Sequence, residues 1–294
     1  MGVISRAGTG RRGPSALLAL AVGASLSACA APRITLTPRF PDGEVRIYRL
    51  VADARTVIDA PGIDAPGIGS GERTVLRADV RIRLGRSAGS RTATLTFTPT
   101  GFERDGTQAE PPAEQSAEIV FDDTGRVESV TAAGDGSVPF GGSPDDIGTI
   151  FGSTIARGPA RIAQRWSEPL ADGTGRRRSR VAALRWVGGY RCAVVESATS
   201  RPVERVREAG GSTIRLIGTE TALVESAFAF DNGFPVRVKA VASGVFDIAG
   251  APGQGTVTIE STTTMTLLDR EIAAPRPTAT ATATARNSRR PARS

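Results

Sequence analysis

Two pairs of adjacent aspartates are the side chains of this 294-residue chain that could perform chemistry: Asp122/Asp123 and Asp145/Asp146. Two carboxyl groups can hydrolyse a glycosidic bond, one acting as the acid and the other as the base or nucleophile. The first pair, however, lies in a turn sequence that ends at Gly125, and the second lies at the expected start of a helix. Aspartates are favoured in both places because they accept backbone hydrogen bonds. We therefore expect structural roles for both pairs.

The absence of histidine excludes the commonest catalytic and metal-binding arrangements. Ser-His-Asp and Cys-His nucleophiles, and histidine-liganded zinc, all need an imidazole. A Ser-Lys dyad is formally available from Ser243 and Lys239, the only lysine, but on a strand these two side chains would lie several ångströms apart. We predict no enzyme activity, no metal and no cofactor, and we assign no catalytic residue.

A short apolar stretch behind a basic N-terminus ends in Leu26-Ser27-Ala28-Cys29. Its length is typical of a signal peptide and falls short of the roughly 20 residues that span a bilayer. The tetrapeptide resembles the lipobox of bacterial lipoprotein precursors. The resemblance implies cleavage between Ala28 and Cys29, a diacylglycerol on the Cys29 sulfur and an acyl chain on its new amine. Two or more such chains anchor a protein stably.

Export to the cell envelope follows from this resemblance. Ala30 stands where lipoproteins retained in the inner membrane often carry aspartate, which implies an outer-membrane anchor facing the periplasm. Arg11-Arg12 leave both general secretion and twin-arginine export open. An ordinary secretory cleavage site, with Cys29 incidental, is the alternative for the leader.

The net charge of +7 is concentrated at the two ends of the chain. Three arginines lie in the leader and five in the acid-free tail after residue 271, so the body between them is nearly neutral. A nucleic-acid groove needs a basic stripe with stacking rings, and aromatic residues make up only 5% of the chain. We predict no nucleic-acid partner. The expected partners are the membrane, through the lipid anchor, and a lipid or apolar ligand, an envelope polymer or another protein.

Apolar and polar residues alternate along much of the body, as in antiparallel strands with one buried face. Asn232-Gly233 is a strong hairpin signal, and Asp122–Gly125 is a second turn. Both turns follow a Ser-Ala and a Phe-Asp, which indicates either an internal duplication or convergent hairpin chemistry. The expected strands are Val45–Val51, Arg55–Asp59, Thr74–Leu84, Arg91–Thr98, Ala117–Phe121, Arg126–Val130, Ala160–Trp166, Val181–Val187, Tyr190–Ser197, Thr213–Thr219, Thr221–Asp231, Phe234–Val245 and Thr256–Leu268.

One helix, over about residues 144–157, is predicted between two β-rich halves. Ser143 supplies an N-cap, Pro144 fits the first turn, and the two aspartates after it face the positive helix end. An apolar stripe at helical spacing would pack on a sheet: Ile147, Ile150, Phe151 and Ile155. The chain thus divides into a signal peptide (1–28), a tether (29–42), an N-terminal β half (43–142), the helix (143–158), a C-terminal β half (159–271) and a disordered Thr/Ala/Arg tail (272–294).

Cys192 is the only thiol of the lipidated chain, so no internal disulfide can form. It lies in an apolar strand pattern, and we expect it to be buried and inert. The direct repeat of Asp-Ala-Pro-Gly-Ile over Asp59–Ile68 is expected to be a loop. Aromatic residues in strand patterns are expected in the core or, alternatively, around a cavity for an apolar ligand: Trp166, Trp186, Phe228, Phe230, Phe234 and Phe246.

The predicted fold is mainly β, either an antiparallel sandwich or an open half-barrel with one central helix, with two related β halves as a further option. An exported, lipid-anchored, strand-rich chain with a helix against its sheet resembles the half-barrel carrier lipoproteins of the Lol type and the mycobacterial glycolipid-binding lipoproteins. That resemblance implies a carrier fold and supplies no ligand residues. We predict a non-catalytic binding, carrier or structural lipoprotein, with a carboxylate-dependent hydrolase of envelope glycans as the alternative.

Overall fold

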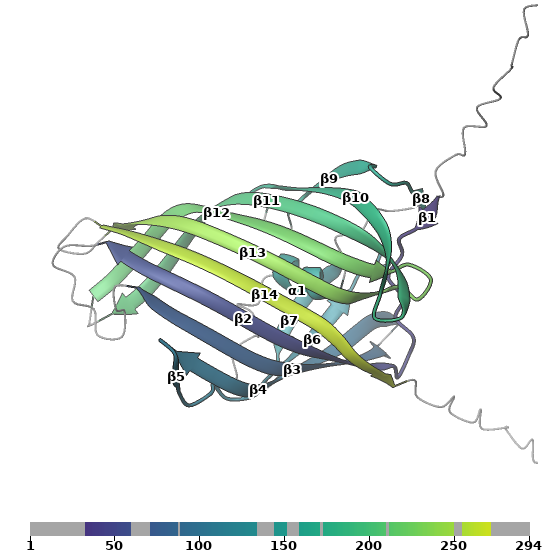
Figure 1. The fold of residues 1–294 in the computed structure, drawn as a ribbon, viewed down its shortest axis with the longest axis horizontal. Coiled ribbons are helices and arrows are strands. Elements are labelled where there is room, and N and C mark those ends of the chain that lie inside the picture. The colour runs from purple at the N-terminus through teal and green to yellow at the C-terminus, as the bar shows by residue number, and fades with distance from the viewer. Residues whose placement is uncertain are drawn as a thin grey trace, which may run out of the picture. The chain divides into compact units, whose positions relative to one another are not determined.

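The computed structural model describes residues 33–59, 71–87, 89–133, 144–151, 159–170, 173–209, 212–249 and 255–271, which all belong to one unit of the chain. These residues form mainly β-strands, with one short helix (Figure 1). The elements are β1 (Ile34–Thr35), β2 (Val45–Asp59), β3 (Glu72–Ser87), β4 (Ser90–Arg104), β5 (Thr107–Gln108), β6 (Gln115–Phe121), β7 (Val127–Ala132), α1 (Pro144–Phe151), β8 (Pro159–Ala160), β9 (Arg165–Pro169), β10 (Arg176–Val187), β11 (Tyr190–Ala209), β12 (Ser212–Ala229), β13 (Phe234–Ala249) and β14 (Gly255–Glu271).

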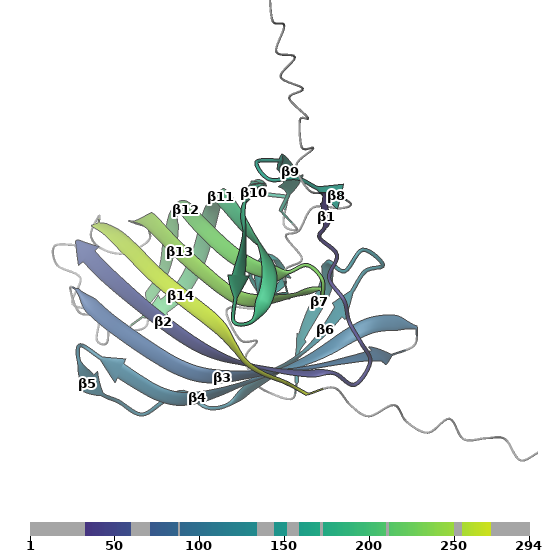
Figure 2. The ribbon, with the colours of Figure 1, turned by 45° about the vertical axis from the view of Figure 1, so that its right-hand side comes forward.

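All the long strands belong to one antiparallel sheet of 12 strands. Its order is β7-β6-β4-β3-β2-β14-β13-β12-β11-β10-β9, with β5 paired to β4. Two consecutive meanders, β2 to β7 and β9 to β14, meet where β2 pairs with β14. The sheet is strongly bent and open, with β7 and β9 at its edges (Figure 2). Of the two predicted architectures, the open bent sheet is therefore the one that forms.

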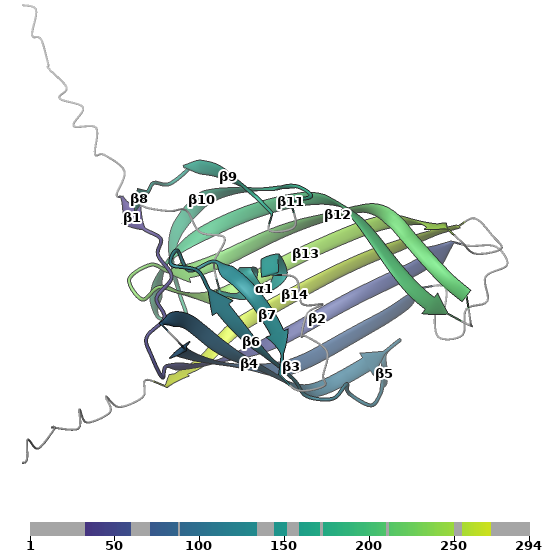
Figure 3. The ribbon, with the colours of Figure 1, turned by 180° about the vertical axis from the view of Figure 1, so that it is seen from behind.

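The largest core cluster lies on the sheet face that packs against α1. The alternation predicted around Val80–Leu84 is confirmed, because Val80, Ile82 and Leu84 are buried while the arginines between them are exposed. The helix contacts β7 and β13, two strands far apart in the sheet, so it lies between the two arms of the bend (Figure 3). The described part of its predicted stripe is buried in this cluster: Ile147, Ile150 and Phe151.

Residues 33–44, which we call the strap, pack along one end of the sheet. β1 pairs with β8, and Leu36 is buried in a cluster with residues of β10, β11 and β12. Farther along, the Arg39 amide donates to the carbonyl of Gly233 at 2.8 Å, and the Phe40 ring lies 4.5 Å from that of Phe121. From residue 33 on, the segment expected to be a tether is thus bound to the fold, because its apolar side chains are buried there.

A buried ion cluster joins the strap to the seam between β2 and β14. Glu44, fully buried, accepts hydrogen bonds from Arg46 Nε at 2.5 Å and from Arg270 Nη2 at 2.6 Å. Both guanidinium groups lie over the ring of Phe234, at 4.8 and 5.0 Å from its centroid. Burial raises the pKa of Glu44, but the hydrogen bonds and charges of the two arginines outweigh it and hold that pKa below its usual value. One carboxylate therefore ties the end of the strap and the start of β2 to β14, 226 residues farther along the chain.

Some predicted element boundaries need correction. The strands expected at Val45–Val51 and Arg55–Asp59 are one strand, as are those at Thr213–Thr219 and Thr221–Asp231, because backbone pairing continues through the polar residues between them. The strand expected at Ala160–Trp166 is interrupted by a turn. Most of the Asp-Ala-Pro-Gly-Ile repeat, Ile155, the tail and the cleavage site at Ala28 and Cys29 lie outside the described residues.

Candidate ligand groove

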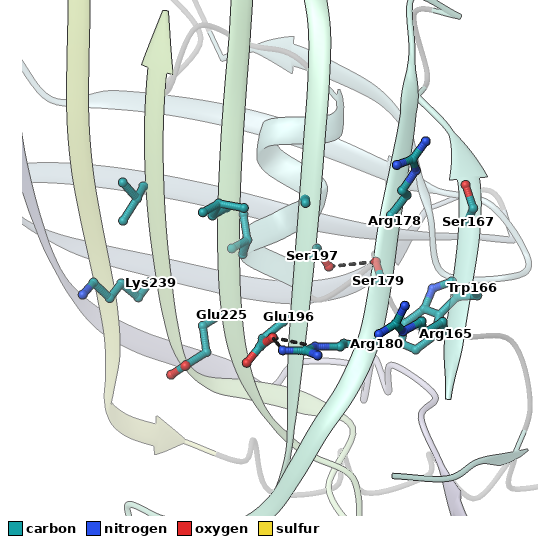
Figure 4. Close-up of a pocket in the computed structure, with 14 residues that line it drawn as sticks. Arg165, Trp166, Ser167, Arg178, Ser179, Arg180, Glu196, Ser197, Glu225 and Lys239 are labelled. Atoms are coloured by element: carbon teal, nitrogen blue, oxygen red, sulfur yellow. Dashed lines mark hydrogen bonds and ion pairs between the residues drawn. The ribbon is translucent and has the colours of Figure 1, made fainter. Parts of the chain in front are cut away.

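A groove of about 790 Å³ crosses strands β9 to β13 (Figure 4). Most of its lining side chains alternate along the strands with residues of the buried face. Val238, for example, packs in the α1 cluster, whereas its neighbour Lys239 lines the groove. Because successive side chains of a strand point to opposite faces, the groove lies on the face turned away from α1.

Backbone pairing sets the lining side chains in two parallel rows, each with one residue from every strand. One row is mostly charged: Arg165, Arg180, Glu196, Glu225 and Lys239. The other is mostly small or apolar: Ser167, Arg178, Ala198, Leu223 and Val241. The sequence signal for this site was too weak to find, since the rows become visible only once the register of five strands is known.

The apolar part of the groove is carried by Leu223 and Val241. These two residues are direct cross-strand partners, and their side chains are 63% and 41% exposed. Ligand pockets are lined mostly by apolar side chains with a few polar groups that fix orientation. An exposed apolar pair in the lining of a groove therefore fits a bound apolar chain.

The cationic part of the groove lies at the opposite end, on β9 and β10. Arg180 is bound to Glu196, with Nε and Nη2 at 2.7 and 2.6 Å from one carboxylate oxygen. Among the described residues, no carboxylate pairs with Arg165 or Arg178, and both are exposed. At one end the groove therefore offers two arginines without a described carboxylate partner. At the other it offers the apolar pair Leu223 and Val241, next to the in-register pair Glu225 and Lys239.

On the buried face of β9 to β11, side-chain contacts hold the strands in register. Ser179 and Ser197, both buried, share a hydrogen bond of 2.8 Å between their hydroxyl groups, as Figure 4 shows. Trp166 of β9, in register with Ser179, packs partly buried against the cluster that contains Leu36. Because the neighbouring face is fixed, the side chains of the groove are held at constant spacing.

The predicted aromatic core is confirmed for Phe228, Phe234 and Phe246, which are buried, and in part for Trp166 and Phe230. The core prediction is wrong for Trp186, which is 72% exposed. Trp186 lies beside the Gly188-Gly189 turn at the end of β10, where its neighbour Arg185 and its cross-strand partner Arg191 are exposed as well.

The aspartate pairs lie in a turn and at the start of a helix. Asp122 Oδ1 accepts hydrogen bonds from the Thr124 amide at 2.8 Å, the Thr124 hydroxyl at 2.6 Å and the Arg126 amide at 2.9 Å. This carboxylate is thus part of its own turn, as expected. Asp145 and Asp146 lie in the first turn of α1, and their side chains are outside the described set.

Two further carboxylates were not singled out from the sequence. Glu196 and Glu225 are cross-strand neighbours in the groove, and Lys239 pairs in register with Glu225. A general acid is usually kept neutral by burial, whereas these two carboxyl groups lie on an open sheet face. Ser243 is hydrogen-bonded to Thr221 and lies four residues from Lys239, about 13 Å along the strand, which is too far for proton transfer.

Cys192 is fully buried in the interior of the hairpin end, as predicted. Burial raises the pKa of its thiol to about 11, so the nucleophilic thiolate is scarce at neutral pH. In the described ranges, no three potential metal-ligating side chains gather in one place. Nor does any helix in that part of the chain have the length and apolar character that crossing a bilayer requires.

Comparison with known proteins adds a fold neighbour. No protein-family model and no curated protein sequence matches the chain. A solved structure described as "Lipid-protein interactions in lipovitellin" is similar over 82% of this chain and 27% of that chain, with a TM-score of 0.42 and 14% identity. The chain therefore spans about a quarter of the length of that neighbour.

Proposed function

We propose that this chain is a lipid-anchored protein of the cell envelope that binds an amphipathic anion, without converting it, in the groove of β9 to β13. The ligand has an apolar chain and an acidic head. One observation carries the proposal: an exposed apolar pair, Leu223 and Val241, shares a groove with two unpaired arginines, Arg165 and Arg178.

The dimensions of the groove suit such a ligand. Four inter-strand spacings of about 4.8 Å separate β9 from β13, so a ligand lying across the strands spans about 19 Å. Its acidic head lies at Arg165 and Arg178, since a guanidinium group binds a carboxylate or phosphate with two parallel hydrogen bonds. Its apolar chain covers Leu223 and Val241, which removes their surface from water at about 25 cal/mol per Å².

The anchor at Cys29 is a separate part of the proposal and is supported by the lipobox in the sequence. Replacement of Cys29 by serine should abolish lipid labelling and the membrane-bound mature form. Lipid labelling that persists in Cys29→Ser would contradict the proposed anchor and would not affect the proposed ligand site in the groove.

A titration with cis-parinaric acid, a fluorescent fatty acid, tests the groove in the absence of vesicles. We expect energy transfer from Trp166, which borders the groove, and weaker binding of the neutral methyl ester. Leu223→Asp should weaken binding by about tenfold or more, because a charge replaces a covered apolar side chain.

Leu268→Asp is the matched control, since Leu268 is 48% exposed and lies on β14, outside the groove. The control should bind parinaric acid like the unmodified chain. Equal loss in both variants, or equal binding of acid and ester, would overturn the proposed site.

A further inference from the structure

Two exposed apolar side chains stand at the β1 end of the fold and are not part of the groove. Ile162 is 41% exposed in the turn between β8 and β9, and Trp186 is 72% exposed at the end of β10. Exposed arginines flank them: Arg33, Arg161 and Arg185. We call these five residues the β1-end patch.

Both apolar residues of the patch lie close to β1. Ile162 is two residues from Ala160, which pairs with Ile34 of β1, and Trp186 is two residues from Leu184, which packs in the same cluster as Ile34. Two residues of a strand span only about 7 Å. Figure 2 shows β1 and β8 beside β9, with the β10-β11 hairpin farther along the sheet. Each of the two apolar residues therefore lies two residues from a member of the cluster that buries Ile34.

The turn that carries Ile162 is held in place by hydrogen bonds. The Gln164 amide donates to the Arg161 carbonyl at 3.0 Å, and the Gln164 side chain accepts from the Arg161 amide at 2.9 Å. The Ala163 amide donates to the Val181 carbonyl of β10 at 2.8 Å, and Ala163 has a positive φ of 65°. Few non-glycine residues adopt that conformation, so the surrounding bonds must maintain it. Ile162 is thus presented on a fixed turn.

Two segments near β1 carry basic residues only, whereas beside Trp186 its cross-strand partner Arg191 pairs with Asp231 at 3.6 Å. The strap from Arg33 to Arg39 contains no acidic residue, and neither does the segment 159–167. Basic residues close to an anionic bilayer surface are attracted to it, and tryptophan prefers the interface between headgroups and acyl chains. Arginines around an isoleucine and a tryptophan therefore match a membrane surface of anionic lipids.

We propose that the β1-end patch docks on an anionic membrane surface, with Ile162 and Trp186 inserted at the headgroup level. This inference rests on the proposed anchor for its orientation: Cys29 precedes Ile34 by five residues, at most about 18 Å of extended chain. An acylated Cys29 would hold β1 against the bilayer, and the patch would then fix which side of the fold faces the lipid. Arg165 lies three residues after Ile162 and lines the cationic end of the groove, so the two surfaces are neighbours along the chain.

The test uses the chain without residues 1–28 and with Cys29→Ser, which keeps every described residue and carries no lipid. Trp166→Phe in this background leaves Trp186 as the only tryptophan. With phosphatidylcholine vesicles that contain phosphatidylglycerol, we expect a blue shift of Trp186 emission and its quenching by lipids with brominated acyl chains. Pure phosphatidylcholine vesicles should produce a much smaller shift.

A matched pair of variants then locates the contact. Ile162→Asp should weaken vesicle binding by about tenfold, because a charged side chain cannot replace the buried isoleucine. Ile217→Asp should leave it unchanged, since Ile217 is 42% exposed and lies on β12 about 40 Å from the hairpin end.

An unchanged Trp186 spectrum, or equal loss in the two aspartate variants, would overturn the docking surface. Because this chain is unlipidated, its result is independent of the Cys29 labelling experiment. Because vesicles are absent from the parinaric acid titration, failure of the groove and failure of the patch are also distinguishable.

Discussion

The ion cluster at the strap and the groove of β9 to β13 are built alike and differ in how their charge is balanced. In each place two arginines are direct cross-strand neighbours: Arg46 with Arg270, and Arg165 with Arg180. At the strap, both guanidinium groups bind the buried Glu44. In the groove, Arg180 binds Glu196, and no carboxylate among the described residues pairs with Arg165.

The two regions show how the role of a charged side chain depends on whether it is buried or exposed. A buried carboxylate must be paired, and removal of one partner leaves an uncompensated charge in the interior. An arginine on an exposed sheet face needs no partner, because water solvates it, and it remains available to a ligand. We therefore expect the strap cluster to determine stability and the groove to determine binding.

The largest expected effect is that of Glu44→Gln on stability. The substitution leaves Arg46 almost fully buried without its carboxylate, and breaking a buried pair costs about 3–5 kcal/mol. Urea unfolding, followed by circular dichroism, measures the loss. A loss below about 1 kcal/mol, the range of surface ion pairs, would show that the cluster is not the stabilising region.

Low pH should destabilise the fold through protonation of Glu44. The pKa of Glu44 is lower in the folded chain than its ordinary value of 4.5, so at low pH protons bind the unfolded state more readily than the folded one. The stabilisation is therefore fully present above about pH 4.5 and is lost as the pH falls through the folded pKa. Glu44→Gln should show a flatter loss of unfolding free energy below pH 4.5 than the unmodified chain.

A smaller effect is expected when the unpaired arginines are removed. Arg165→Gln with Arg178→Gln should weaken binding of cis-parinaric acid by about tenfold and leave binding of its methyl ester unchanged, because only the acid makes charge-assisted hydrogen bonds. Urea unfolding should be unaffected. If the acid and the ester lose affinity equally, the two arginines do not contact the acidic head.

The smallest effect is expected for Arg180, whose partner is on the surface. Arg180 and Glu196 are 50% and 40% exposed, and exposed ion pairs contribute about 0.2–1 kcal/mol. Arg180→Gln should change the free energy of unfolding within that range, and high salt should reduce the difference. A loss as large as that of Glu44→Gln would contradict the contrast between the two regions.

Local patterns in the sequence predicted the local parts of the fold. Alternation identified the face that carries Val80 and Ile82, and turn residues identified the hairpins at Gly125 and Gly233. The start of the helix was predicted from its cap and its apolar stripe. Each of these features depends on residues within a few positions of one another.

Features that join distant residues could not be predicted in the same way. The pairing of β2 with β14, the burial of Glu44 and the rows of the groove all depend on register between strands far apart in the sequence. Period-two patterning assigns a residue to a face but does not say whether that face is covered. For this reason Trp186 was expected in the core, and Leu223 was not expected at a site.

The central claim is that the groove holds an amphipathic anion in the cell. Mass spectrometry of the lipids that co-purify with the full chain from its native cells tests it most directly, because a covalent lipid at Cys29, as proposed, would stay on the protein during solvent extraction. We predict about one extractable acidic lipid per chain in the unmodified protein and in Leu268→Asp, and almost none in Leu223→Asp. No extractable acidic lipid in the unmodified protein, or equal amounts in Leu223→Asp and Leu268→Asp, would contradict the account.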